Sequence, residues 1–188
     1  MPPKTAVTRA MVEEAAFDIV RAAGADALSV RAIAEKIGCS TQPVYTACGS
    51  IATVREAVGA RCKIVAETFM RTGRGGEPPF LQIGIGALRF AHEEPHLFRL
   101  AGEFMRARLL DPPPEAVLAA MRADPALCQL DDAHLRRIHA LMWIFAQGLA
   151  GLVGPGAAEG ALVDAIAYLR MAGRAVVAWE LNPANNTS

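Results

Sequence analysis

Residues 29–45, SVRAIAEKIGCSTQPVY, decide the fold because they carry start and stop signals for two short helices in succession. Ser29 is a favoured N-cap residue. The apolar residues that follow it have the spacing of one helix face: Val30, Ile33, Ala34 and Ile37. Gly38 suits a helix C-terminus, and Ser40 can cap a further helix that tolerates Pro43 in its first turn. The sequence therefore predicts two helices joined by a tight turn.

The rest of the chain also has the pattern of helices. Apolar residues recur at helical spacing almost throughout, and no segment shows the alternation that is typical of a strand. We expect helices over 8–22, 30–37, 41–48, 51–71, 80–93, 96–109, 115–122, 132–153 and 157–181. Residues 72–79 form the clearest linker, and Pro112–Pro114 cannot continue a helix. An all-α fold is the prediction.

Composition narrows the class of protein. Of 188 residues, 53% are hydrophobic and 20% are charged, which indicates a globular chain. No apolar run reaches the roughly 20 residues of a membrane span, and the N-terminus lacks the apolar stretch of a signal peptide. We therefore expect a cytoplasmic protein with no membrane partner. The four cysteines form no C-x-x-C pair, so neither a zinc site nor a disulfide framework is expected, and no cofactor is implied.

Charge alone does not indicate a nucleic-acid partner. The whole chain has a net charge of zero, and residues 1–63 carry eight basic and six acidic side chains. A DNA-binding surface is usually more strongly basic than this.

The second of the two short helices contains the residues that indicate a function. We expect four neutral hydrogen-bonding side chains to face outward from it: Thr41, Gln42, Tyr45 and Thr46. Such groups suit base edges and phosphate oxygens, as in a helix-turn-helix. Gln42 is the candidate for adenine readout, while Tyr45 and Ser40 are candidates for phosphate contacts. The alternative is a packed three-helix unit whose polar residues merely face solvent.

Residues 8–58 resemble the N-terminal domain of the tetracycline-repressor (TetR) family, above all in the stretch 27–58, ALSVRAIAEKIGCSTQPVYTACGSIATVREAV. The matching positions are Ser29, the run Val30–Ala34, Gly38, Ser40, Val44-Tyr45 and Gly49-Ser50. The resemblance implies a helix-turn-helix DNA-binding domain over residues 1–50 and an effector-binding and dimerisation domain over residues 51–188. It also implies a homodimer on a palindromic double-stranded DNA operator, released by a small apolar or aromatic effector, and no enzymatic activity. The DNA-contacting residues would be Ser29, Arg31, Ser40, Thr41, Gln42, Tyr45 and Thr46.

Two positions depart from the family pattern. Cys48 stands where the family usually has an aromatic residue, and Ile51 stands where it usually has a lysine that contacts phosphate. Loss of that lysine removes one counterion-releasing contact, for which Arg31, Arg9 or Arg55 could compensate. The departure keeps a second hypothesis open, namely a helical ligand-binding protein with weak or lost DNA binding.

The region after residue 71 supplies candidates for the effector pocket and the dimer interface. The pocket would be lined by Phe69, Phe90, Phe98, Phe104, Met105, Met121, Trp143 and Gln147; the alternative is that most of these are plain core. The last two helices are broadly apolar, and the resemblance implies that they pair with their copies in a partner subunit. Burial within one chain is the alternative.

One motif suggests a different class of protein, a metal-dependent enzyme. Residues 92–96, HEEPH, match the H-E-x-x-H signature of zinc proteases, which needs both histidines on one continuous helix. Pro95 kinks or ends that helix, so we expect a helix junction rather than a metal-dependent enzyme using His92 and His96.

Overall fold

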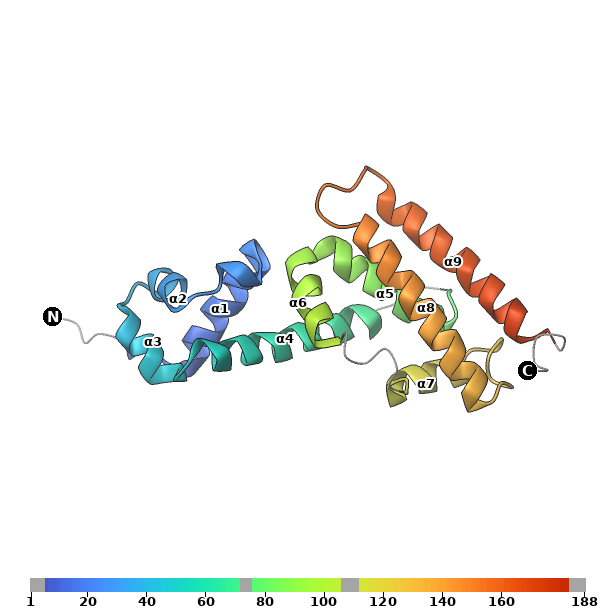
Figure 1. The fold of residues 1–188 in the computed structure, drawn as a ribbon, viewed down its shortest axis with the longest axis horizontal. Coiled ribbons are helices and arrows are strands. Elements are labelled where there is room, and N and C mark those ends of the chain that lie inside the picture. The colour runs from blue at the N-terminus through green and yellow to red at the C-terminus, as the bar shows by residue number, and fades with distance from the viewer. Residues whose placement is uncertain (1–5, 72–75, 106–111, 183–188) are drawn as a thin grey trace. The chain divides into compact units, whose positions relative to one another are not determined.

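The computed structural model describes residues 6–71, 76–105 and 112–182, excluding the side chains of residues 103–105. The described chain forms α1 (Arg9–Ala23), the 3-10 turn η1 (Ala25–Ala27), α2 (Val30–Ile37), α3 (Thr41–Cys48), α4 (Ile51–Arg71), α5 (Pro79–Glu93), α6 (Pro95–Met105), α7 (Glu115–Arg122), α8 (Asp132–Leu152) and α9 (Ala161–Glu180) (Figure 1). None of the described residues lies in a strand. The predicted all-α fold is therefore confirmed.

The described helix boundaries agree with the predicted ones to within one residue, except at the start of the last helix. Residues 106–109, predicted as the end of the helix that begins at residue 96, lie outside the described residues. The last helix begins at Ala161 rather than at residue 157, because Gly160 adopts a left-handed conformation with φ of 85° just before it. The turn η1 was not expected from the sequence. No described helix has the length and apolar character needed to cross a membrane.

The chain divides into two compact units. Met1–Val65 and His96–Phe104 form the N-terminal unit, while Ala66–Pro95 and Met105–Ser188 form the C-terminal unit. The N-terminal unit thus extends beyond residue 50 and includes both the first part of α4 and most of α6.

In the N-terminal unit, α1–α4 meet around a small apolar core. Thr8 caps α1 by accepting a hydrogen bond from the N–H of Met11 at 3.3 Å. The core side chains are at most 2% exposed: Val12, Ala16, Val20, Ile33, Val44, Val54, Val58 and Cys62. Burial raises the pKa of the Cys62 thiol to about 11.

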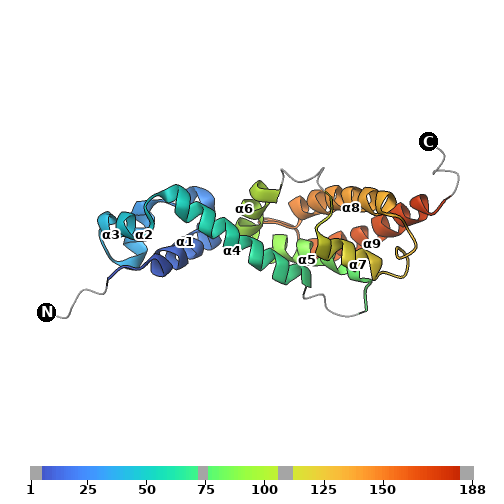
Figure 2. The same ribbon diagram turned by 90° about the horizontal axis from the view of Figure 1, so that it is seen from below.

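In the C-terminal unit, α8 packs against both α5 and α9, and α7 lies against α5 (Figures 1 and 2). Two glycines of α5 allow close approach. A Cβ atom on Gly86 would lie 2.4 Å from the carbonyl oxygen of Phe69 in the last turn of α4, and one on Gly84 would lie 2.9 Å from Leu169 Cδ2 of α9. The backbone of α5 therefore touches the backbone of α4 where only glycine fits.

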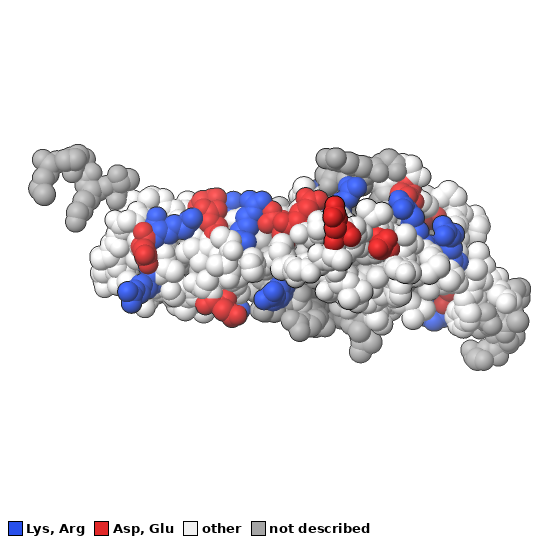
Figure 3. All heavy atoms as spheres, turned by 90° about the horizontal axis from the view of Figure 1, so that it is seen from above, with Lys and Arg blue, Asp and Glu red and all other residues white. Residues whose placement is uncertain are grey.

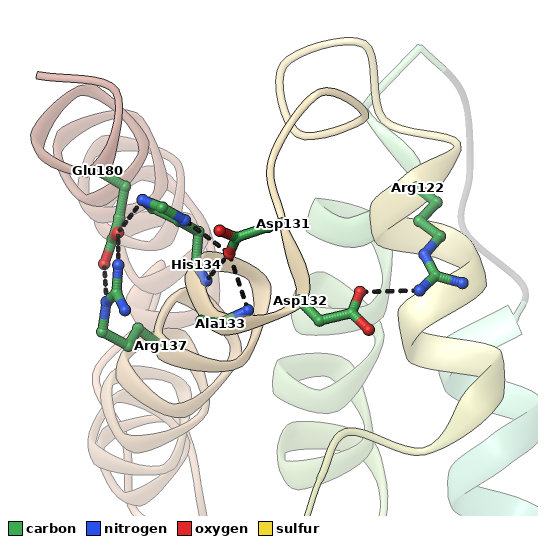
Figure 4. Close-up of polar contacts among 7 residues, drawn as sticks. All are labelled: Arg122, Asp131, Asp132, Ala133, His134, Arg137 and Glu180. Atoms are coloured by element: carbon green, nitrogen blue, oxygen red, sulfur yellow. Dashed lines mark hydrogen bonds and ion pairs between the residues drawn. The ribbon is translucent and has the colours of Figure 1, made fainter. Parts of the chain in front are cut away.

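A charged cluster joins the start of α8 to the end of α9 (Figure 4). The fully buried Glu180 accepts hydrogen bonds from Arg137 Nε at 3.0 Å and from its Nη2 at 2.8 Å. His134 lies between two carboxylates, with Nδ1 2.7 Å from Asp131 Oδ1 and Nε2 3.9 Å from Glu180 Oε2. Hydrogen bonds from the backbone N–H and then the ring of His134 lower the pKa of Asp131 to about 2. The cluster satisfies a carboxylate that would be costly to bury alone.

Candidate nucleic-acid interface

Backbone caps fix the turn between α2 and α3. Ser29 Oγ accepts a hydrogen bond from the N–H of Ala32 at 3.1 Å, so the predicted N-cap of α2 is confirmed. Gly38 ends the helix in the left-handed region (φ 78°), and the N–H groups of Gly38 and Cys39 both donate to the carbonyl of Ala34 at 2.9 Å. Ser40 occupies the N-cap position of α3, but its side chain makes no capping hydrogen bond.

The orientation of α3 follows from one buried side chain. Val44 is 2% exposed and faces the core that also holds Ile33. Thr41, Gln42, Tyr45 and Thr46 are all exposed, Tyr45 by 50%. Thr41 and Tyr45 are four residues apart, as are Gln42 and Thr46, and helix positions with this spacing lie on the same side. These two neighbouring rows form one neutral exposed surface. The predicted exposure is confirmed, whereas DNA contact by these residues stays a prediction.

One of these four exposed side chains, that of Thr46, has a hydrogen-bond partner within α3. The hydroxyl of Thr46 donates a hydrogen bond to the carbonyl oxygen of Gln42, one turn earlier, at 3.0 Å. That bond uses the only proton that the Thr46 side chain can donate. The sequence offered only a weak signal for this contact, namely a threonine inside a helix, where such back-bonding is common.

Three cations of the N-terminal unit are engaged with carboxylates of the same unit. Arg9 pairs with Glu13 at 2.6 Å, and Lys36 with Asp18 at 3.2 Å. A third guanidinium, Arg61, binds Glu14 and stacks 4.0 Å above the Phe17 ring. Basic and acidic side chains are accordingly interspersed on the face of the N-terminal unit that Figure 3 shows.

Arg31 differs from these cations. It is exposed on α2 and forms no ion pair with any residue that the structure describes. It lines an open depression of about 310 Å³ between α2 and the start of α3, together with Ala34, Glu35, Cys39, Ser40 and Thr41. A cation beside an uncapped helix N-terminus suits an anionic group such as a phosphate.

The two departures from the family pattern also lie near this surface. Ile51 is the first residue of α4 and is 37% exposed. Ser50 caps this helix by accepting a hydrogen bond from the N–H of Thr53 at 3.2 Å. Ile51 thus places an apolar side chain in the first turn of α4, at the position where the resemblance predicted a lysine. Cys48 is partly buried, and this burial raises the pKa of its thiol.

The structure places the predicted pocket residues in different surroundings, and their role in binding an effector stays a prediction. Phe90 and Met121 are at most 1% exposed, and the Phe69 ring centroid lies 5.3 Å from that of Phe90, so these side chains fill the core of the C-terminal unit. Trp143 and Gln147 are partly exposed on α8. Phe98 belongs to the N-terminal unit instead. The side chains of Phe104 and Met105 lie outside the described residues. Neither of two depressions on the described surface is lined by any of these residues.

The HEEPH segment is a helix junction, as its proline predicts. α5 ends at Glu93, Glu94 leaves the helical region with φ of −132°, and α6 begins at Pro95. His92 Nδ1 lies 3.0 Å from the carbonyl oxygen of Val153, while a Cβ on Gly24 would lie 3.2 Å from His96 Nδ1. The two histidines thus have separate structural contacts. Among the described residues, no three His, Cys, Asp or Glu side chains form a metal-binding cluster.

A second surface is apolar and exposed. On α8 it comprises Leu141, Ile144, Phe145 and Leu152, and on α9 it comprises Val163, Tyr168, Met171 and Trp179, all at least 40% exposed. The opposite faces of these helices hold buried residues such as Met142, Ala165 and Leu169. Each helix therefore has one apolar face inside the unit and another toward solvent. The sequence alone does not show which apolar residues of these helices are buried and which are exposed.

No family model, curated protein or solved structure matches the chain. The resemblance to the TetR family, which depends on the motif residues quoted above, therefore stays a prediction.

Proposed function

We propose that the protein is a dimeric, sequence-specific DNA-binding transcription regulator of the TetR type. The observation that carries the proposal is the exposed neutral face of α3, anchored through buried Val44 and preceded by a capped α2 and a tight turn. A helix with neutral hydrogen-bonding side chains, held against a rigid support, is suited to the major groove of DNA.

The exposed apolar surface of α8 and α9 supports the dimer. Single exposed apolar residues are common on monomers, but adjacent helices with eight such side chains form a patch of the kind that marks an interface. A second copy of the chain is the occupant proposed, since a two-fold dimer gives each half of a palindromic operator its own α3.

Arg31 supplies the phosphate contact nearest α3 in this proposal. With Ile51 in place of a lysine, few contacts release counterions, so the salt dependence of binding should be shallow. The exposed side chains of α3 would then contribute mainly to sequence specificity and less to overall affinity. These are Thr41, Gln42, Tyr45 and Thr46.

Regulation by a small apolar or aromatic effector completes the proposal, and repression is the outcome that the family resemblance implies. Effector binding in the C-terminal unit would have to favour a state in which the operator is bound less tightly. A coupling free energy of about 1–3 kcal/mol corresponds to a 5- to 150-fold change in operator affinity.

Selection of bound duplexes from random DNA tests the proposal. We expect an inverted repeat, and we expect Gln42→Glu to abolish its enrichment because the added carboxylate faces phosphates and base acceptors. Gln129→Glu is the matched control, since that exposed glutamine lies in the C-terminal unit. Absence of selective binding would refute the regulator and favour a ligand-binding protein without DNA binding.

Sedimentation of the free protein tests the dimer separately. Ile144→Glu places a charge in the exposed apolar surface and should convert the dimer to monomer. Ala119→Glu on the exposed side of α7 is the control and should leave the dimer intact. A monomeric wild-type protein at micromolar concentration would refute this interface.

A further inference from the structure

The chemistry of the exposed face of α3 restricts the bases that it can distinguish. The helix reads TQPVYTAC and contains no charged side chain. Arginine and lysine are the usual partners of guanine, whose major-groove edge offers only the acceptors O6 and N7. The α3 surface therefore lacks the side chains that most strongly select a G·C pair.

Gln42 and Thr46 have complementary properties for an A·T pair. The exposed Gln42 carboxamide both donates and accepts, which matches the N7 acceptor and N6 donor of adenine. Thr46 has already used its hydroxyl proton on the Gln42 carbonyl. It can offer a base only its lone pairs and its methyl group, and the methyl group suits the 5-methyl of thymine.

Spacing allows both contacts within one short stretch of DNA. Gln42 and Thr46 are one helical turn apart, a rise of about 5.4 Å to 6 Å along the axis. Successive bases on one strand are about 3.4 Å apart. The two side chains can therefore reach bases no more than about two steps from one another.

We propose that α3 reads A·T pairs in each operator half-site, with Gln42 bidentate on an adenine and Thr46 against the methyl group of a nearby thymine. This inference rests on the proposed function, because it concerns the same surface. It assigns different roles to the two halves of the threonine side chain: the hydroxyl is structural, and the methyl group is the reader.

The test uses the selected operator and four variants of the full chain. Gln42→Ala should lower discrimination between adenine and the other bases at one position of each half-site by about 5- to 150-fold. Thr46→Val keeps the methyl group and should weaken binding clearly less than Thr46→Ser. Thr46→Ser keeps the hydroxyl, loses the methyl group and should weaken binding by about fourfold for each half-site. Arg31→Ala should weaken binding to all sequences alike.

Deoxyuridine in place of thymine provides the matched change on the DNA, since it lacks only the 5-methyl group. The substitution should weaken wild-type binding by about fourfold for each half-site in which it replaces the contacted thymine. It should have no further effect on Thr46→Ser, because the same contact is already absent. Melting of each variant, followed by circular dichroism, checks that it is folded.

Three results would overturn the inference. They are a half-site centred on G·C pairs that Gln42→Ala does not alter, a loss with Thr46→Val as large as with Thr46→Ser, and full additivity of Thr46→Ser with deoxyuridine. All three require sequence-selective binding, so they leave the proposed function standing. Absence of any selective duplex would refute the proposed function itself.

Discussion

Substitution of Gly86 by alanine should reveal the backbone contact between α5 and α4. The added Cβ would lie 2.4 Å from the carbonyl oxygen of Phe69 and 2.7 Å from the Cα of Met70. Ordinary contacts of this kind are about 3.5 Å or longer, so the two helices must separate by about 1 Å. Both atoms belong to backbone, and no side-chain rotation can relieve the overlap.

The free energy of unfolding should fall by about 1–2 kcal/mol. Overpacking in a well-packed interior costs about 1–3 kcal/mol, and replacing a helical glycine by alanine returns up to about 1 kcal/mol. For a chain of this size, a loss of 1 kcal/mol lowers the melting temperature by about 2–4 °C. Gly86→Ala should therefore melt roughly 2–8 °C below the wild type.

Tryptophan fluorescence is the suitable assay, because Trp143 and Trp179 both lie in the C-terminal unit and are the only two tryptophans. Gly173→Ala is the matched control. Its added Cβ would lie 3.7 Å from Met142 Cε, an ordinary contact, so the melting temperature should rise by up to about 4 °C. If Gly86→Ala melts at or above the wild-type temperature, the close approach of α5 to α4 is refuted.

Three further predictions concern single side chains. Ser29→Ala should reduce the free energy of unfolding by about 1 kcal/mol, because it removes the cap of α2. Ser40→Ala removes no capping hydrogen bond and should change the free energy of unfolding by far less. Equal losses for the two variants in a denaturant titration would contradict this prediction. Asp131 has a pKa near 2, so its stabilising contribution is complete above the ordinary value of about 3.9 and is lost as the pH falls toward 2. The melting temperature of Asp131→Asn should consequently vary less than that of the wild type between pH 4 and pH 2, and parallel profiles would count against the capping role. Alkylation at pH 8 should modify exposed Cys128 in the native protein but buried Cys62 only after unfolding, as mass spectrometry can show; early labelling of Cys62 would contradict its burial.

Local signals predicted much of the fold. Ser29 and Gly38 mark the ends of α2 because capping depends on residues next to one another in the chain. The exposure of Gln42 and Tyr45 follows from the helical period and the position of Val44. These inferences need no knowledge of distant contacts.

Tertiary contacts could not be predicted from these local signals. A glycine such as Gly86 looks merely like a weak helix former until the helix that touches it is known. The partner of buried Glu180 is Arg137, 43 residues earlier, and no sequence spacing relates them. Aromatic residues such as Phe69 and Phe90 suit a pocket or a core equally well, and only their ring contact shows that they pack together. Such features depend on how helices are brought together.

The composition of the N-terminal unit has a consequence for synthesis on the ribosome. The unit includes His96–Phe104, which follows a 30-residue segment assigned to the other unit. Leu97 and Leu100, which lie within His96–Phe104, are 1% exposed in the folded chain. When residue 71 has emerged, α1–α4 have all been synthesised, but the apolar groups that pack against α6 cannot yet be covered. At about 5–20 residues per second, the nascent unit waits several seconds for them. A fragment ending at Arg71 should for the same reason be prone to aggregate, although it contains every residue proposed to contact DNA.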